Sequence, residues 1–297
     1  EDEVLRVVGD SSKRGRDHLE LAGAQIDMKR GARLSGSRFA YLRGDLVMLE
    51  MALVQWALAK LRGKGFEPVI PPVLVREHAL YGTGMLPDTE QQIYHVPSDE
   101  LYLAGTSEVA LASLHASEIL DAAELPLRYA GFSPCFRREA GAAGKDTRGI
   151  FRVHQFDKVE MFSFVDPGAS EEEHARLRDL QIDLLAGLGL HGRVVDIPVG
   201  DLGDAAARKY DIEVWLPGQE AYRELTSASN CTDYQARRLR CRYRVADKET
   251  ALVHTLNGTA VAVGRTIIAL LETHQRADGT VAVPEALRSH LGADVIG

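Results

Sequence analysis

The sequence predicts an α+β fold in which a mainly antiparallel sheet is flanked by helices. Strand-like segments follow one another as hairpins, and helical segments are interspersed without the regular strand–helix–strand alternation of a parallel sheet. The chain of 297 residues is long enough to bury a large core, and its 45% hydrophobic and 26% charged residues are typical of globular proteins. The sequence contains no internal repeat and no low-complexity segment.

Composition and charge limit the classes of function. The formal net charge of −8 argues against a surface that wraps nucleic acid without specificity, although it allows local anion sites. The three cysteines have neither CxxC spacing nor an even count, so we expect buried or free thiols rather than disulfides or structural zinc. No apolar run approaches the length of a membrane span, and the acidic N-terminus does not resemble a secretory signal. We therefore expect a cytoplasmic protein with no membrane partner.

The N-terminal part begins with a polar segment and leads to a strong helix. Residues 1–16 are interpreted as a lead-in, the remnant of a junction with something larger upstream, and a short helix is expected near residues 18–25. Apolar residues near the 3.6-residue period predict a helix over Asp45–Arg62, with Asp45 as its N-cap. The next stretch, GFEPVIPPVLV, is extended, and its three prolines place it at a sheet edge or an interface.

Small polar residues mark the elements that come next. Short strands are expected over residues 92–96 and 100–104. Thr106 or the serine after it can cap a helix, which would put Glu108 in the first turn. Residues 170–173 have the S-x-x-E pattern of a capping box and predict the start of another helix.

The segment 131–164 predicts a long hairpin that carries the most informative residues. Its connection, residues 140–149, holds three glycines and several charges, among them Lys145. Arg137 and Glu139 would share a face of the first arm. On the second arm, alternation would point Val153 away and place five side chains on one face: Arg152, His154, Phe156, Lys158 and Glu160. Such a face is a plausible floor for a nucleotide, because arginines suit phosphates and an aromatic ring can stack a purine.

The C-terminal third predicts further strands and one helix. A strand is expected over residues 191–199, and a second hairpin joins residues 210–216 to 222–227. A last strand over 252–256 would lead through an NGT sequence into a helix over about 259–272.

Several candidate residues of the hairpin also have an ordinary structural interpretation. Arg137 and Glu139 could form an exposed salt bridge, which contributes little to stability. Phe156 could belong to the core, and His154 is more often a structural residue than a base. Their position together in one hairpin favours a binding site.

Candidates outside the hairpin leave similar alternatives. Glu224 and Ser227 could hold a hard cation that bridges phosphates, although such pairs more often form turns or caps. Arg265 lies in a helix of small and apolar residues, where it must bind an anion or, in the interpretation favoured for a lone helical arginine, extend to the solvent. The polar groups at 106–108 and 257–259 could recognise an ammonium and a hydroxyl on a small ligand, or simply cap their elements.

Taken in order, these segments resemble the three motifs of class II aminoacyl-tRNA synthetases, and most closely those of the bacterial seryl-tRNA synthetases. GFEPVIPPVLV is similar to motif 1, FRREAGAAGKDTRGIFRVHQFDKVEMF to motif 2, and LNGTAVAVGRTIIALLE to motif 3. TSE resembles the serine-site segment of that family, and RELTSASN its ATP and metal segment. The similarity covers roughly residues 17–291 and implies a class II catalytic domain over residues 17–297.

The resemblance also implies a set of site residues. It implies a serine–tRNA ligase that uses ATP and Mg2+, with Arg137, Arg152 and Arg265 as the catalytic residues and Glu224 and Ser227 as the metal ligands. The implied ATP-binding residues are Arg137, Glu139, Arg152, Val153, Phe156, Glu224, Ser227 and Arg265. The implied serine-binding residues are Thr106, Glu108, Arg137, Glu160, Asn257 and Thr259.

One departure from the family leaves alternatives for the acceptor. Bacterial members begin with a long helical arm that binds tRNA, and no heptad-bearing segment precedes Asp17. The resemblance therefore implies a homodimer that activates L-serine, with charging of tRNA(Ser) weakened if the arm is truly absent. The alternative hypothesis is an armless homologue that adenylates a small amino acid for transfer to a carrier protein. A non-catalytic paralogue is disfavoured, because the three motif arginines are all present.

Overall fold

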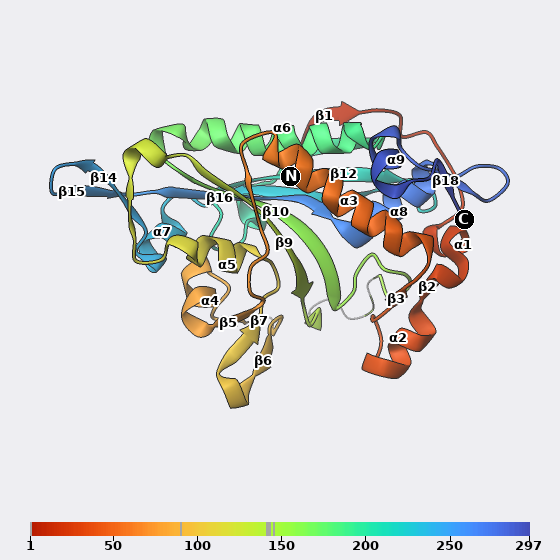
Figure 1. The fold of residues 1–297 in the computed structure, drawn as a ribbon, viewed down its shortest axis with the longest axis horizontal. Coiled ribbons are helices and arrows are strands. Elements are labelled where there is room, and N and C mark those ends of the chain that lie inside the picture. Colours follow the sequence, from red (N-terminus) through yellow and green to blue (C-terminus); the bar gives the residue numbers. More distant parts are fainter. Residues whose placement is uncertain (1, 90, 141–143, 145) are drawn as a thin grey trace.

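An eight-stranded sheet forms the centre of the molecule (Figure 1). The computed structural model describes residues 2–89, 91–140, 144 and 146–297, so Lys145 and part of the predicted connection lie outside the described residues. Neighbouring strands of the sheet are antiparallel, except that its last strand is parallel to the one beside it. In sheet order the strands are β1 (Glu3–Val8), β11 (Gly192–Asp196), β12 (Arg208–Leu216), β13 (Ala221–Asn230), β16 (His254–Ala262), β10 (Gln155–Val165), β9 (Leu127–Phe136) and β4 (Glu67–Val69). The predicted α+β class with a mainly antiparallel sheet is confirmed.

Three helices pack together on one face of this sheet and enclose the main core. They are α3 (Asp45–Arg62), α6 (Ser170–Gly187), which runs along the sheet in Figure 1, and α8 (Val263–Thr273). Their buried side chains, such as Leu53 and Leu177, meet Val159 and Met161 of β10. Burial of this much apolar surface is the principal force that holds the layers together.

Shorter elements complete the molecule. The remaining helices are α1 (His18–Ala22), α2 (Met28–Ser35), α4 (Glu77–Thr83), α5 (Glu108–Ala112), α7 (Tyr234–Leu239) and α9 (Glu285–Leu291). In the described residues, four small sheets are formed by β5 (Leu74–Arg76), β7 (Leu101–Leu103) and β6 (Tyr94–Val96); by β15 (Glu249–Leu252), β14 (Arg242–Ala246) and β8 (Ile119–Asp121); by β2 (Ile26–Asp27) and β3 (Tyr41–Leu42); and by β17 (Val281–Ala282) and β18 (Val295–Ile296).

The opposite face of β10 changes character along its length. Phe162 and Phe164, at the far end of the strand, are fully buried in a second core beneath α5 and α7. Phe156, Lys158 and Glu160, which lie on the same face by alternation, line a cavity instead. The strand therefore joins a packed core to a polar cavity.

Several predicted elements differ from the structure in their ends. The helix over Asp45–Arg62 is confirmed, but its N-cap is Gly44, at a φ of 61°, and Asp45 is the first helical residue. The predicted start of a helix at residue 259 is wrong, because β16 continues to Ala262 through its pairing with β10. Residues 3–8 of the expected lead-in form β1, which pairs with β11.

The expected capping box at residue 170 is also wrong. α6 begins there, but Ala169 is the N-cap and no side chain caps the helix. The Ser170 hydroxyl donates to Asn230 Oδ1, and the Glu173 carboxylate accepts from Arg128 and Ser163. Both side chains of the motif therefore bond to residues of the sheet instead of capping the helix.

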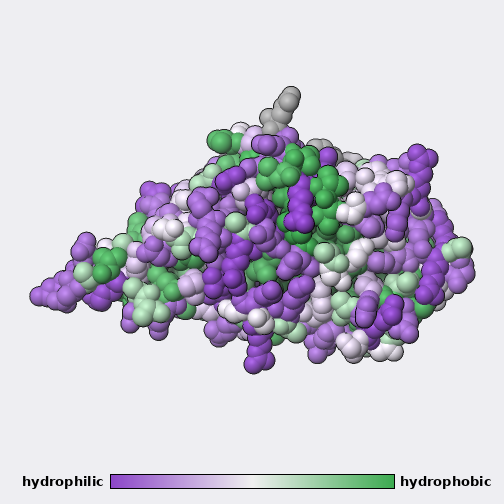
Figure 2. All heavy atoms as spheres, turned by 90° about the horizontal axis from the view of Figure 1, so that it is seen from above, coloured by the Kyte–Doolittle hydropathy of each residue, from purple (hydrophilic) through white to green (hydrophobic). Residues whose placement is uncertain are grey.

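The edge position of the proline-rich stretch is confirmed, since β4 is the last strand of the main sheet. The three cysteines are buried and free, as expected. Within the described ranges, no helix is both long and apolar enough to cross a membrane. Figure 2 shows hydrophobic residues gathered near the middle of an otherwise largely hydrophilic face.

Candidate active site

A cavity of about 240 Å³ lies where β10, β13 and β16 meet the segment that precedes β10. All thirteen predicted site residues line it: Thr106, Glu108, Arg137, Glu139, Arg152, Val153, Phe156, Glu160, Glu224, Ser227, Asn257, Thr259 and Arg265. An adjoining cavity of about 840 Å³ shares Thr106, Arg137, Glu139 and Arg152 with it. The structure thus brings together residues that are spread over 160 positions of the chain, because four separate segments converge here.

Where the hairpin lines the cavity, parts of both arms are irregular chain and do not follow the predicted strand alternation. Period-two alternation holds only from Gln155 onward, where β10 begins, so the predicted shared face for Arg152 and His154 is wrong. Before β10 the chain is irregular, and Arg152 and Val153 both line the cavity. Glu139 also lies beyond its strand, with a φ of 52°, so it joins Arg137 through a turn rather than through strand periodicity.

His154 is a structural residue, which was the favoured interpretation. Its Nδ1 donates to the carbonyl oxygen of Arg137 at 2.9 Å, and its ring lies 5.1 Å from that of Phe39. This hydrogen bond links the two arms of the hairpin next to Arg137 on the first arm and Arg152 on the second.

Three arginines lie at one end of the cavity. Arg152 Nη1 donates to Glu139 Oε2 at 2.7 Å, while its buried Nε has no hydrogen-bond partner and lies 3.7 Å from Asp146 Oδ2. The Arg137 guanidinium lies 5.3 Å from the centre of the Phe156 ring, and its Nε donates to the carbonyl of Gly105. Most donors of these guanidinium groups thus remain available for an anion.

Arg265 completes this end of the cavity from the first turn of α8. Its side chain is 22% exposed and its guanidinium lies 4.5 Å from the centre of the Phe151 ring. Nη1 donates to the carbonyl of Glu224 at 3.0 Å and lies 3.4 Å from Glu224 Oε1. Burial lowers the pKa of Arg265. The favoured interpretation, in which this arginine extends to the surface, is therefore wrong.

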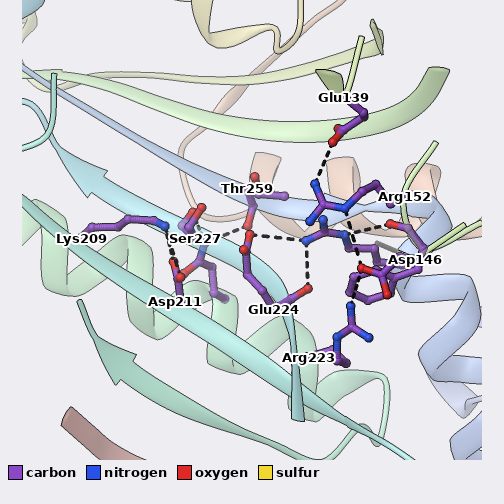
Figure 3. A network of polar contacts seen from close by, with 12 residues as sticks. Glu139, Asp146, Arg152, Lys209, Asp211, Arg223, Glu224, Ser227 and Thr259 are labelled. Carbon is purple, nitrogen blue, oxygen red and sulfur yellow. Dashed lines mark hydrogen bonds and ion pairs between the residues drawn. The ribbon is translucent and has the colours of Figure 1, made fainter. Parts of the chain in front are cut away.

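A β-bulge places Glu224 and Ser227 on the same cavity. Residues three apart in a regular strand point to opposite faces. In β13, however, Thr226 pairs with Ile212 and Glu224 pairs with Glu213, so Leu225 is an extra residue. Figure 3 shows Glu224, Ser227 and Thr259 close to one another, with Arg152 beyond them.

The opposite end of the cavity is lined by carboxylates, amides and hydroxyls. Glu108 Oε1 accepts from Asn257 Nδ2 at 3.0 Å, and the Thr259 hydroxyl donates to Glu160 Oε2 at 3.3 Å. The Thr106 hydroxyl accepts from the backbone N–H of Glu108 at 3.2 Å and lines the cavity, whereas the N-cap of α5 is Ser107, whose side chain makes no capping bond.

The charge of Glu108 is sensitive to its surroundings. Burial, together with the negative charge of Glu160, raises the pKa of Glu108 to about 7. A hydrogen bond from Gln235 and the positive charges of Lys158 and Arg137 act in the opposite direction. A cationic ligand beside Glu108 would also favour its ionised form.

Sequence reasoning missed three residues of this site. Lys158 lies on the predicted face of β10, and the sequence predicts no role for it, although it contacts both Thr106 and Glu160. The centre of the Phe151 ring lies 4.1 Å from the guanidinium group of Arg223 and 4.5 Å from that of Arg265. Gln235 lies behind the cavity, and nothing in the helical pattern of its segment distinguishes it. For Phe151 and Lys158, adjacency to the motif arginines was a usable signal.

The donor set suits a hard divalent cation only with help from a ligand. In the part of the chain that the structure describes, no group of three or more His, Cys, Asp or Glu side chains could hold a metal ion. Glu224 and Ser227 supply two oxygen donors beside the arginines, and Mg2+ prefers six. The residues therefore fit a magnesium ion that takes its other ligands from phosphates and water.

The two ends of the cavity suit ligands of different chemistry. Arginines, an aromatic ring and oxygen donors at one end suit a nucleoside triphosphate with its metal ion. Carboxylates and hydroxyls at the other end suit a small ligand with an ammonium group. Because both ends belong to one cavity, two ligands bound there would have their reactive groups in contact.

Comparisons with known proteins agree with this geometry. The model of the family described as tRNA synthetase class II core domain (G, H, P, S and T) matches residues 94–274. The serine–tRNA ligase of Clavibacter michiganensis is 57% identical over 93% of this chain and 65% of its own length. That of Clavibacter sepedonicus is 55% identical over 97% of this chain and 69% of its own length.

A solved structure gives the same result. The seryl-tRNA synthetase of Pyrococcus horikoshii, crystallised with ATP, superposes with a TM-score of 0.93 at 50% identity, covering 95% of this chain and 64% of that one. The chain thus spans about two thirds of the length of the curated relatives it matches.

Proposed function

Because the chain belongs to the serine–tRNA ligase family of class II aminoacyl-tRNA synthetases, we propose that it activates L-serine with ATP and transfers the seryl group to tRNA(Ser). The observation that carries this proposal is the single cavity in which three arginines and an aromatic ring adjoin a pocket of carboxylates and hydroxyls. Such a cavity brings a triphosphate and an amino acid together, which adenylation requires.

ATP occupies the arginine end. Arg137 holds the α-phosphate, Arg152 reaches the β- and γ-phosphates, and Arg265 clamps the γ-phosphate from the opposite side. Phe156 stacks on the adenine, Glu139 accepts from its amino group, and Val153 lines the same part of the cavity. Arg152 Nη1 donates to Glu139 Oε2 at 2.7 Å, so the residues assigned to the phosphates and to the adenine are joined.

Serine occupies the other end. Thr106, Glu108 and Glu160 surround its ammonium group, Arg137 neutralises its carboxylate, and Asn257 and Thr259 lie near its hydroxyl. The site would discriminate against an amino acid that lacks the hydroxyl, because polar groups of the cavity would then be left without a partner.

Glu224 and Ser227 would hold a magnesium ion with the ATP phosphates. The ion would neutralise phosphate charge that the arginines do not reach. The Glu224 carbonyl and carboxylate also contact Arg265, so the metal ligand and the phosphate clamp are joined.

The chain's own residues act by positioning and by electrostatics. The serine carboxylate attacks the α-phosphorus in line, the bond to the leaving pyrophosphate breaks, and the arginines neutralise the developing charge. No side chain of the protein serves as a nucleophile. The terminal ribose hydroxyl of tRNA then attacks the carbonyl of the adenylate and releases AMP.

The wider setting of the enzyme follows from the same proposal. We place it in the cytoplasm, with residues 17–297 as the main part of the catalytic domain and β1, within residues 1–16, as an edge strand of its sheet. The partner in a homodimer packs against α3 and the proline-rich stretch, where Met48, Met51 and Ile70 are exposed to the solvent. Large exposed apolar side chains of this kind are typical of an interface.

Amino-acid-dependent exchange of pyrophosphate into ATP, measured across the twenty amino acids, tests the proposal. Serine should support exchange, and Arg137→Ala should abolish it while the circular dichroism spectrum stays unchanged. Arg14→Ala, which removes a guanidinium whose side chain is 78% exposed, is the matched control. Exchange that persists near the wild-type rate in Arg137→Ala would contradict the assignment. Labelled serine offered to tRNA(Ser) and, separately, to a carrier protein identifies the acceptor.

A further inference from the structure

Gln235 lies at the centre of a buried hydrogen-bond network behind the amino-acid end of the cavity. It is on α7, and none of its surface is exposed. Its Nε2 donates to Glu108 Oε1 at 2.7 Å, and its Oε1 accepts from the Thr255 hydroxyl at 2.8 Å. Gln235 does not itself line the cavity, so it can act on a ligand only through Glu108.

The direction of the Gln235 amide is fixed by its partners, which include the Thr83 carbonyl, an acceptor 3.4 Å from Nε2. An ionised carboxylate can only accept hydrogen bonds, so the NH2 group must face Glu108 and the amide oxygen must face Thr255. Thr255 is held in turn by the main chain, since its N–H donates to Thr232 and its carbonyl accepts from Cys231, both at 3.0 Å. The amide therefore approaches Glu108 from a rigid support.

Both donors to Glu108 meet the same carboxylate oxygen. Asn257 Nδ2 and Gln235 Nε2 both donate to Oε1, at 3.0 and 2.7 Å. Their convergence leaves Oε2 as the oxygen to accept from a ligand in the cavity that Glu108 lines. Of the two donors, Asn257 lines the cavity and Gln235 does not.

We propose that Gln235 is a positioning residue for amino-acid recognition, which holds Glu108 by one oxygen so that the other accepts from the ammonium group of bound serine. This inference rests on the proposed function, because it assigns Glu108 to the substrate ammonium. It adds a residue that touches neither substrate nor metal.

The network also favours the charged form of Glu108. The charged groups around it are Glu160, Lys158 and Arg137, of which Glu160 raises its pKa and the two cations lower it. Burial is the main cause that raises the pKa of Glu108 to about 7, a value that already includes the lowering by the Gln235 bond. Without that bond, Glu108 would hold a proton at neutral pH and lose its charge–charge attraction to the ammonium.

Two variants test the proposal in serine-dependent pyrophosphate exchange. Gln235→Met keeps the volume and removes the donor, and Thr255→Val keeps the shape and frees the amide to turn. We expect Gln235→Met to raise KM for serine by about 10- to 100-fold and Thr255→Val by less, with KM for ATP changed by no more than about twofold. Thr266→Val is the matched control, because Thr266 is also buried but its hydroxyl donates to the carbonyl of Ala262, the N-cap of its own helix.

The pH dependence separates positioning from a merely structural role. In Gln235→Met, KM for serine should fall as the pH rises from about 6.5 to 8.5, and its midpoint should lie above that of the wild type, because a weaker Glu108 acid ionises later. The inference would be overturned if the variant lowered the melting temperature and kcat but left KM for serine and the pH midpoint unchanged. Wild-type protein without serine-dependent exchange would overturn the proposed function as well.

Discussion

The ammonium group of Lys158 lies 2.6 Å from the Thr106 hydroxyl and also contacts the Glu160 carboxylate. These are two of the three groups proposed to hold the ammonium of serine. A cation from the protein itself thus occupies part of a cation-binding site, and the lysine balances two buried carboxylates that would otherwise repel each other. Because one lysine faces the two carboxylates of Glu108 and Glu160, this end of the cavity keeps negative charge for a further positive group when both carboxylates are ionised.

Lys158→Met should lower the free energy of unfolding by about 3 kcal/mol at pH 8, because it leaves the buried carboxylate of Glu160 without its partner. The loss should be smaller near pH 6, where Glu108 takes up a proton more readily because burial raises its pKa to about 7. Urea denaturation at both pH values measures the difference. Lys64→Met, at an exposed position, serves as the control, and an equal loss at the two pH values would refute the electrostatic origin.

Glu173→Gln should destabilise the protein by about 2–3 kcal/mol, far more than Ser170→Ala, at about 1 kcal/mol. The Glu173 carboxylate receives two bonds from Arg128, at 2.7 and 2.6 Å, and one from Ser163 at 2.8 Å. A capping box would make the two losses similar, since its two side chains are reciprocal. Chemical denaturation of both variants under one condition decides between the two arrangements.

The same helix start shows what sequence can and cannot predict. The S-x-x-E pattern located the first residue of α6 correctly, because propensity and patterning are local. The true partner of Glu173 is Arg128, forty-five positions away, and no local rule contains that information. The bulge at Leu225 is similar, since only the register with β12 shows that Glu224 and Ser227 share a cavity.

The site residues were predictable for a different reason. Motif resemblance supplied thirteen positions that the structure brings to one cavity, whereas residues outside the motifs, such as Gln235, have no sequence signal and gain their importance from packing. The strand that carries Asn257 and Thr259 was shortened in the prediction, because NGT is a turn-like sequence. Pairing with β10 overrides that preference.

Glu50→Gln should stabilise the protein at alkaline pH. Burial and the neighbouring Asp157 carboxylate raise the pKa of Glu50 from 4.5 to about 8. The folded state thus holds a proton that the unfolded state has lost, so stability is greatest below about pH 4.5 for this group and falls as the pH rises through about 8. Glutamine keeps a neutral hydrogen-bonding group, and we expect a gain of about 1–2 kcal/mol at pH 9. Denaturant unfolding at pH 6 and 9 should show a flatter pH profile than in the wild type; a profile parallel to that of the wild type would contradict the raised pKa of Glu50.

Phe156→Leu should weaken ATP binding while it spares serine. Stacking of a base on an aromatic ring contributes about 1–3 kcal/mol, so KM for ATP should rise roughly tenfold. The ring also faces the Arg137 guanidinium at 5.3 Å, and its loss frees that side chain. Pyrophosphate exchange at varied ATP and saturating serine gives the first constant, and the reverse experiment gives the second. Equal increases in both constants would mean that the ring supports the fold of the cavity rather than the adenine.

Glu224→Gln and Ser227→Ala should raise the magnesium concentration needed for half-maximal exchange by about tenfold, with part of the maximal rate restored at high magnesium. The reason is the small number of protein donors, since the loss of one of two oxygen ligands weakens the hold on an ion that is otherwise bound by phosphates and water. Glu213→Gln is the matched control, because Glu213 pairs with Glu224 in the ladder but directs its carboxylate to Arg193 and does not line the cavity. Removal of magnesium with EDTA should abolish exchange in every variant. If Glu224→Gln followed the magnesium titration of the control, the carboxylate would serve Arg265 alone, and the bulge at Leu225 would have its function in positioning that arginine.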